Sequence, residues 1–208
     1  ATFGDTHWTG YTYLGELPSG AFGFNSHGVG FTLNWLGPTD VQCPGLGRGF
    51  ISRSILDAKT VDEAVRLATT PAQSAGPHYH LFDTLKQTAF NLEAAPRGEY
   101  AVRPIDGDSA LFHANEYIML AIPQVLSNSS IHRMARAAQL VDGVRDTKSV
   151  LAGLGDQKDH AWPVFHDDIS HAAGDLGGVG GDGGSGGGGG RAGEASVTSS
   201  QKRPSVVK

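Results

Sequence analysis

The sequence predicts an α+β protein in which antiparallel strands and helices occupy separate stretches of the chain. Two observations predict this. Alternating apolar and polar residues, typical of half-buried strands, come in two groups, and stretches with apolar residues at helical spacing lie between and after them. Blocks of strands and blocks of helices argue against a parallel sheet, in which single strands alternate with single helices. The 208 residues predict one domain, 1–173, and a tail, 174–208.

The first pair of strands lies in GAFGFNSHGVGFTLNW, residues 20–35. Both runs alternate with a period of two, and Gly28 can take the positive φ that a tight turn between them requires. The two strands end on amides, Asn25 and Asn34. A buried amide is either a structural clamp on neighbouring backbone or a polar group that faces a cleft, and the sequence leaves both open.

Two helices follow a loop rich in glycine and proline. In FISRSILDAK, Ile51, Ile55 and Ala58 fall on one face. Thr60 and Glu63 form a capping box for the next helix. That helix is amphipathic, with apolar residues at helical spacing: Val61, Ala64, Val65 and Ala68.

Residues 78–115 return to strand character in three runs, HYHLFDT, TAFNLEA and ALFHAN. Asn128-Ser129-Ser130 caps a third helix, and Thr147 caps a fourth. The fourth helix places three residues inside: Val150, Leu151 and Leu154.

The tail is dominated by glycine and is predicted to be disordered, since it cannot bury enough apolar area to offset the entropy of ordering. Residues 177–182, GGVGGD, fit the start of a calcium-binding nonapeptide repeat. The frame occurs once, and such repeats need several stacked copies. A plain linker is therefore the better interpretation.

Charge and composition exclude several classes of partner. With 16 basic and 21 acidic residues, the net charge of −5 gives no reason to expect a nucleic acid or an anionic membrane surface. No apolar run is long enough to span a membrane. The single cysteine, Cys43, excludes an internal disulfide, and nothing around it would activate the thiol. No cofactor motif is present.

Five polar side chains in the second group of strands are candidates for a site. His78 and His80 share a strand face and could be a pair of metal ligands. Because no third ligand is evident, a solvated strand is the better interpretation. His113 and Asn115 end an apolar run and could donate hydrogen bonds to a polarised carbonyl. Glu93 is either an ion-pair partner or a base.

The order of these pieces resembles a known family. GFNSHGVGFTLN, GLGRGF, FISRSILDAKTVDEAVRLA, NLEAAP and FHAN follow one another as in the isopenicillin N acyltransferase family, also called peptidase C45, a branch of the N-terminal-nucleophile hydrolases. The resemblance covers approximately residues 8–168. It implies an αββα sandwich, in which helices cover the outer faces of two stacked antiparallel sheets.

The resemblance also implies a reaction. Members cut their own precursor before a cysteine, whose thiolate attacks an amide while the freed α-amino group serves as base. Asn115 matches the asparagine that donates to the oxyanion. Asn25 and Asn34 match asparagines that line or brace the site, and His113 belongs to the same H-x-N motif as Asn115. Glu93 matches an acidic residue to which the resemblance assigns no role. We expect all four to contribute to substrate binding. The implied substrate is a small-molecule amide, with no cofactor or metal.

Two departures from the family pattern limit the expectation. The family nucleophile precedes the first hairpin, whereas Cys43 follows it. The last strands of the family have no counterpart after AWPVFHDD. We therefore expect a chain truncated at both ends, inactive by itself, whose partner is a missing N-terminal segment or subunit. The alternative is a non-catalytic module that binds amides.

Overall fold

The computed structural model describes residues 1–17, 20–107 and 110–166. The expected tail, its GGVGGD frame and the expected end of the domain at 167–173 lie outside these residues. Seven strands form one antiparallel sheet whose spatial order follows the chain. They are β1 (Thr2–Phe3), β2 (Thr6–Gly10), β3 (Phe22–Asn25), β4 (Val29–Leu36), β5 (Gly76–Asp83), β6 (Thr88–Ala94) and β7 (Tyr100–Pro104). This confirms a mixed fold with antiparallel strands.

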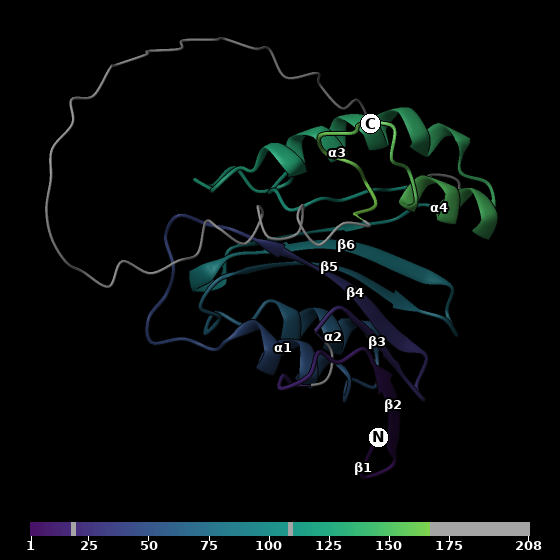
Figure 1. Ribbon diagram of the computed structural model, residues 1–208. Coiled ribbons are helices and arrows are strands. Elements are labelled where there is room, and N and C mark those ends of the chain that lie inside the picture. The colour runs from purple at the N-terminus through teal and green to yellow at the C-terminus, as the bar shows by residue number, and fades with distance from the viewer. Residues whose placement is uncertain (18–19, 108–109, 167–208) are drawn as a thin grey trace, which may run out of the picture.

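Helices lie on both faces of the sheet. Figure 1 shows α1 (Arg48–Ile55) and α2 (Val61–Ala68) on one side, and α3 (Asn128–Leu140) and α4 (Thr147–Leu154) on the other. Short 3₁₀ turns, Pro96–Gly98 and Val141–Gly143, follow β6 and α3. None of the helices in the described ranges is long and apolar enough to cross a membrane.

The first hairpin and the first two helices form as the sequence predicts. Gly28 turns the chain between β3 and β4 with a φ of +82°. On α1 and just beyond it, the three predicted apolar residues are buried: Ile51, Ile55 and Ala58. The Thr60 side chain caps α2 by accepting from the Glu63 N–H at 3.2 Å. The Glu63 carboxylate reaches the N–H of Lys59 instead of completing the box at Thr60.

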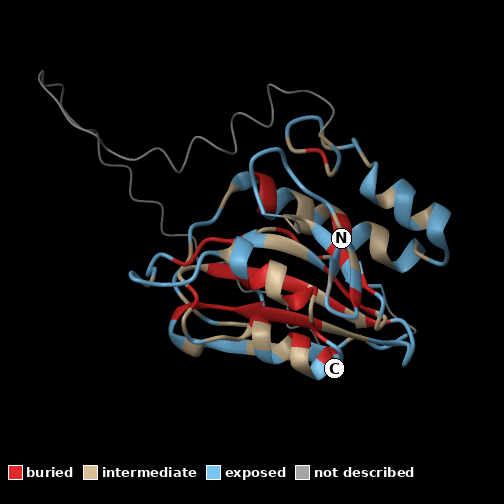
Figure 2. Ribbon diagram, turned by 90° about the horizontal axis from the view of Figure 1, so that it is seen from below, coloured by how far each residue is buried: buried red, intermediate tan, exposed pale blue. Residues whose placement is uncertain are grey.

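The central strands have one apolar face and one polar face. The apolar face packs on α1 and α2 and includes Phe31, Tyr79, Leu81 and Leu92. The register of β4, β5 and β6 puts polar side chains on the opposite face: Thr32, Asn34, His78, His80, Asn91 and Glu93. Figure 2 shows burial extending along these strands. Three of these polar side chains, His78, Asn91 and Glu93, are therefore buried beneath the second layer.

The second layer differs from the prediction. Residues 110–115 are not a strand; β7, which the sequence did not predict, pairs with β6 instead. The carbonyls of His113 and Ala114 accept from the Asn34 side chain, and the Ala114 N–H points to Met134 Sδ. Side chains thus take the place of a strand partner. The described part of the chain contains one sheet, where the resemblance implied two.

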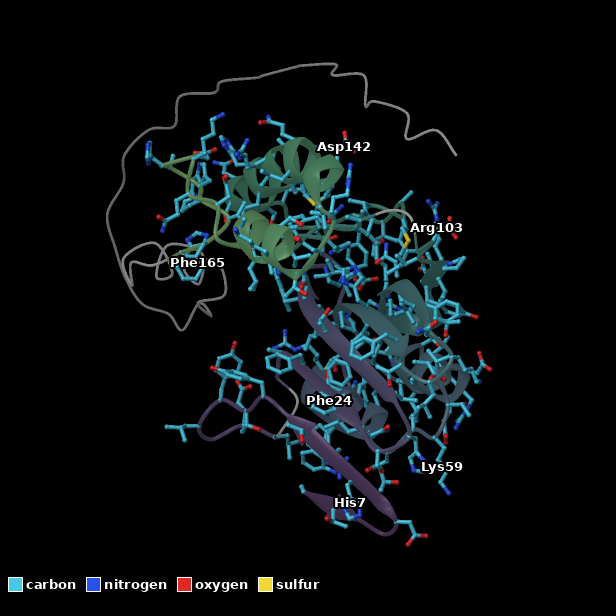
Figure 3. All side chains as sticks on the ribbon, turned by 90° about the vertical axis from the view of Figure 1, so that its right-hand side faces the viewer. His7, Phe24, Lys59, Arg103, Asp142 and Phe165 are labelled. Carbon is cyan, nitrogen blue, oxygen red and sulfur yellow. The ribbon has the colours of Figure 1, made fainter. Side chains whose placement is uncertain are left out.

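Helices α3 and α4 form where expected, but each begins with a different cap. Ser127 caps α3 and Asp146 caps α4. The predicted inner residues of α4 are wrong, because α4 lies at the periphery: Val150, Leu151 and Leu154 are 41%, 62% and 49% exposed. In Figure 3, His7 and Phe24 mark the β2–β3 end of the molecule, and Asp142 marks the layer of α3.

Candidate functional site

A cavity of about 410 Å³ lies where the end of β4, the start of α1 and the segment around residue 113 meet. Its polar lining comes from separate elements and includes Asn34, Arg48, His113, Asn115 and Arg133. Its apolar and aromatic lining includes Tyr13, Leu33, Trp35, Phe112, Leu154 and Val164. Such a cavity, which combines converging polar groups with aromatic and apolar side chains, can hold a small molecule.

Asn115 presents its amide at this cavity in a fixed orientation. Arg133 Nη2 donates to Asn115 Oδ1 at 2.9 Å, and Asn115 Nδ2 donates to the Trp35 carbonyl at 2.9 Å. Because one neighbour is a donor and the other an acceptor, only one orientation of the amide satisfies both. Its second N–H has no acceptor among the residues that the structure describes and can donate to a ligand.

Asn34 holds the segment that carries Asn115. Its Nδ2 donates to the carbonyl of His113 at 2.5 Å and to that of Ala114 at 3.1 Å. The end of β4 therefore fixes the backbone next to Asn115. Asn34 also lines the cavity, so it combines the two roles that the sequence left open.

Glu93 and His113 form a fully buried pair. Their side chains are 0% exposed, and His113 Nε2 lies 3.1 Å from Glu93 Oε1. The same carboxylate accepts from the backbone N–H groups of Ile118, Met119 and Leu120 at 2.7 to 3.1 Å. Glu93 thus anchors both ends of the stretch that contains Asn115.

Opposing influences set the charge of Glu93. Burial disfavours the ionised form, but hydrogen bonds from His113 and the backbone N–H groups of Ile118, Leu120 and Met119 outweigh it. The net result is a lowered pKa of the Glu93 carboxyl. With all these bonds made, the ionised carboxylate holds the backbone of residues 118–120 and the His113 side chain in place.

His78 and His80 are not on a solvated strand face as the sequence favoured. The His78 ring is buried and stacks on His113, with centroids 3.4 Å apart and planes 1° from parallel. Burial, followed by the proximity of His113 and His80, lowers the pKa of His78 to about 2. Burial and His113 lower the pKa of His80 to about 4. Within the described ranges, no group of three His, Cys, Asp or Glu side chains could hold a metal ion.

Asn25 has the geometry of a clamp. Its Nδ2 donates to the carbonyls of Leu56 and Ala58 at 3.1 and 2.7 Å, and its Oδ1 accepts from the N–H groups of His27 and Val29. These bonds tie the β3–β4 turn to the end of α1. All hydrogen-bonding positions of the amide are used within the protein, and Asn25 does not line the cavity.

Two lining residues escaped the sequence analysis. Arg133 lies one helical turn after Ser129 and donates to its hydroxyl at 3.1 Å, a spacing visible in SSIHR. Arg48 gave no local signal, since its place in the same cavity as Asn115 depends on long-range packing. Cys43, an exposed free cysteine, does not line the cavity.

An asparagine held beside a cavity by buried polar residues is the kind of site that binds a polarised carbonyl. Residues 3–173 match the family model described as acyl-coenzyme A:6-aminopenicillanic acid acyl-transferase, and the chain belongs to this family. This confirms the resemblance inferred from the sequence. The chain is also similar to beta-alanyl-dopamine/carcinine hydrolase of Drosophila melanogaster, with 23% identity over 143 residues, covering 62% of this chain and 37% of that protein. This chain therefore spans little more than a third of the length of that relative.

Proposed function

We propose that this chain forms the amide-binding part of a C–N amide hydrolase or N-acyltransferase of the N-terminal-nucleophile cysteine type. Its substrates are small N-acylated amines or peptide-like amides. Membership of the acyltransferase family and the similarity to a hydrolase support this kind of function. In the whole protein, a second sheet would complete an αββα sandwich.

The single observation that carries the proposal is the state of Asn115. Its amide oxygen is held by Arg133, and one N–H is left for a ligand at the cavity. A preorganised, uncharged donor stabilises the negative charge that develops on a carbonyl oxygen under attack. Asn115 would therefore act as the oxyanion donor. Asn34 would hold it in place, and Glu93 with His113 would support the same segment.

The nucleophile in this proposal is a cysteine outside the present chain. Cys43 is exposed and does not line the cavity, so its thiol is not placed to attack an amide bound at Asn115. The position of Cys43 also favours a second candidate function, a non-catalytic module that binds amides. Under either function, the 208-residue chain should not turn over N-acyl amines.

Kinetics of the full gene product test the proposal. Asn115→Ala should lower kcat by about 10² to 10³, with a smaller effect on KM, because the lost donor acts mainly in the transition state. Asn128→Ala, at an exposed position that begins α3, is the matched control and should leave kcat unchanged. Near-normal kcat in Asn115→Ala would show that the oxyanion is held elsewhere. An inactive full gene product that still binds N-acyl amines would favour the binding module.

A second assay addresses the chain itself. The 208-residue chain should release no amine from N-acyl amines above a denatured control. Turnover that Cys43→Ala abolishes would contradict the proposal and make Cys43 the nucleophile.

A further inference from the structure

Arg48 enters the amide site from the start of α1. Its side chain is half-buried and lines both the cavity that holds Asn115 and an adjoining cavity of about 410 Å³. Gly20 and Trp35 also line both cavities, so the two cavities lie next to one another at Arg48. Burial raises the pKa of the Tyr79 hydroxyl to about 12, and the nearby hydroxyl of Ser52 and charge of Arg48 oppose that rise. Arg48 is therefore close to the inner side of α1.

Among the described residues, Arg48 has no carboxylate partner, unlike several other arginines of this chain. Four of them form ion pairs with Asp or Glu: Arg53, Arg66, Arg97 and Arg136. In the described residues, no carboxylate oxygen lies within 4 Å of the Arg48 guanidinium. Glu16 lines the adjoining cavity but lies beyond this distance. A half-buried guanidinium loses part of its hydration, and an ionised ligand can compensate for that loss.

The rest of the site also favours a negative group. The described lining of the cavity that holds Asn115 contains no Asp or Glu. Gly47 precedes α1 without a side-chain cap, so the positive end of the helix dipole adds to the charge of Arg48. Tyr13, Trp35 and Phe112 supply aromatic surface between the polar groups. A ligand that fits this lining combines an amide, an aromatic or apolar group and an anion.

We propose that Arg48 binds the carboxylate of the substrate, and that the substrate class is an N-acyl amino acid or a related amide with a free carboxylate. This inference rests on the proposed function, because that function puts the amide at Asn115. The forked guanidinium pairs with a carboxylate through two parallel hydrogen bonds. Arg48 is thus a specificity-determining residue in the same cavity as Asn115.

Binding measurements on the 208-residue chain test this assignment. The probes are N-acetyl-phenylalanine, its neutral carboxamide and the cation phenylalaninamide, each titrated calorimetrically. The carboxylate should bind about 10- to 100-fold more tightly than the carboxamide, the range expected for hydrogen bonds between charged groups. The cation should bind most weakly. Arg48→Gln should remove the preference, Arg48→Lys should keep part of it, and Arg66→Gln, an exposed control on α2, should change nothing. Thermal melts will verify that each variant folds.

Three results would overturn the assignment. They are equal binding of carboxylate and carboxamide, an unchanged preference in a folded Arg48→Gln variant, and no binding of any probe. The experiment also separates this inference from the proposed function. If the carboxylate is preferred but Asn115→Ala weakens no probe, the Arg48 subsite stands and the amide site at Asn115 fails. If Asn115→Ala weakens all probes and none is preferred, the amide site stands without the carboxylate subsite.

Discussion

Replacing Glu93 by glutamine tests whether this carboxylate holds the layer that carries Asn115. Glu93 accepts from His113 Nε2 at 3.1 Å and from the N–H groups of Ile118, Met119 and Leu120. Glutamine has nearly the same shape but replaces one oxygen with an NH₂ donor. In one orientation this donor faces the N–H groups of Met119 and Leu120; in the other it faces His113 and Ile118.

The cost follows from these contacts. Either orientation loses two hydrogen bonds to a charged acceptor, each worth about 1.5 to 3 kcal/mol, and opposes buried donors to one another. We expect a loss of roughly 3 to 5 kcal/mol in the free energy of unfolding, as for a broken buried ion pair. That is a large share of the ~5 to 15 kcal/mol that stabilises a typical domain.

Urea denaturation at pH 7 measures the loss. Glu99→Gln, the same change at an exposed position just before β7, should stay within about 0.5 kcal/mol of wild type. Acid provides a second check. Because the pKa of Glu93 is lowered from 4.5, its ionised form stabilises the fold above pH 4.5, and this contribution is lost as the pH falls through the folded-state pKa. The difference between wild type and Glu93→Gln should shrink there. A loss below about 1 kcal/mol at pH 7 would refute the anchoring role.

Two further predictions concern the neighbouring polar residues. His78 has a pKa of about 2 in the folded protein against 6.5 for the free side chain, so the unfolded state takes up an extra proton below pH 6.5 and stability falls as the pH falls. His78→Gln should reduce the slope of unfolding free energy between pH 6 and pH 5 by up to about 1.4 kcal/mol per pH unit; equal slopes would contradict the buried neutral ring. Asn25→Ala should lower the free energy of unfolding by about 3 kcal/mol, because two N–H groups and two carbonyls lose a shared partner. The same variant should bind N-acetyl-phenylalanine as wild type does, and lost binding with unchanged stability would instead make Asn25 a substrate-binding residue.

Local rules were sufficient for the elements near the start of the chain. Gly28 predicted the β3–β4 turn because glycine adopts a positive φ without steric cost. Thr60 predicted the cap of α2 because its hydroxyl can accept from a backbone N–H in the first turn of the helix. The period of two in β5 and β6 predicted strands but left the environment of the polar face undetermined. The prediction of a solvated face at His78 was wrong, because nothing in the adjacent sequence indicates that a second layer covers this face.

The sequence by itself determined the family, the strands β3 to β6, the helices and most of the polar candidate residues, because each depends on short-range patterns and on the order of motifs. The tertiary structure decided which candidates meet. Glu93 and His113 pair across 20 residues, and Asn34 binds backbone 79 and 80 residues further along the chain. The conformation of residues 110–115 also depends on tertiary contacts. Two carbonyls of this segment accept hydrogen bonds from the Asn34 side chain instead of from a neighbouring strand. The alternation of apolar and polar residues gives no information about such a partner. Arg48 lines the same cavity as Asn115 for the same reason, through the packing of α1 on the sheet.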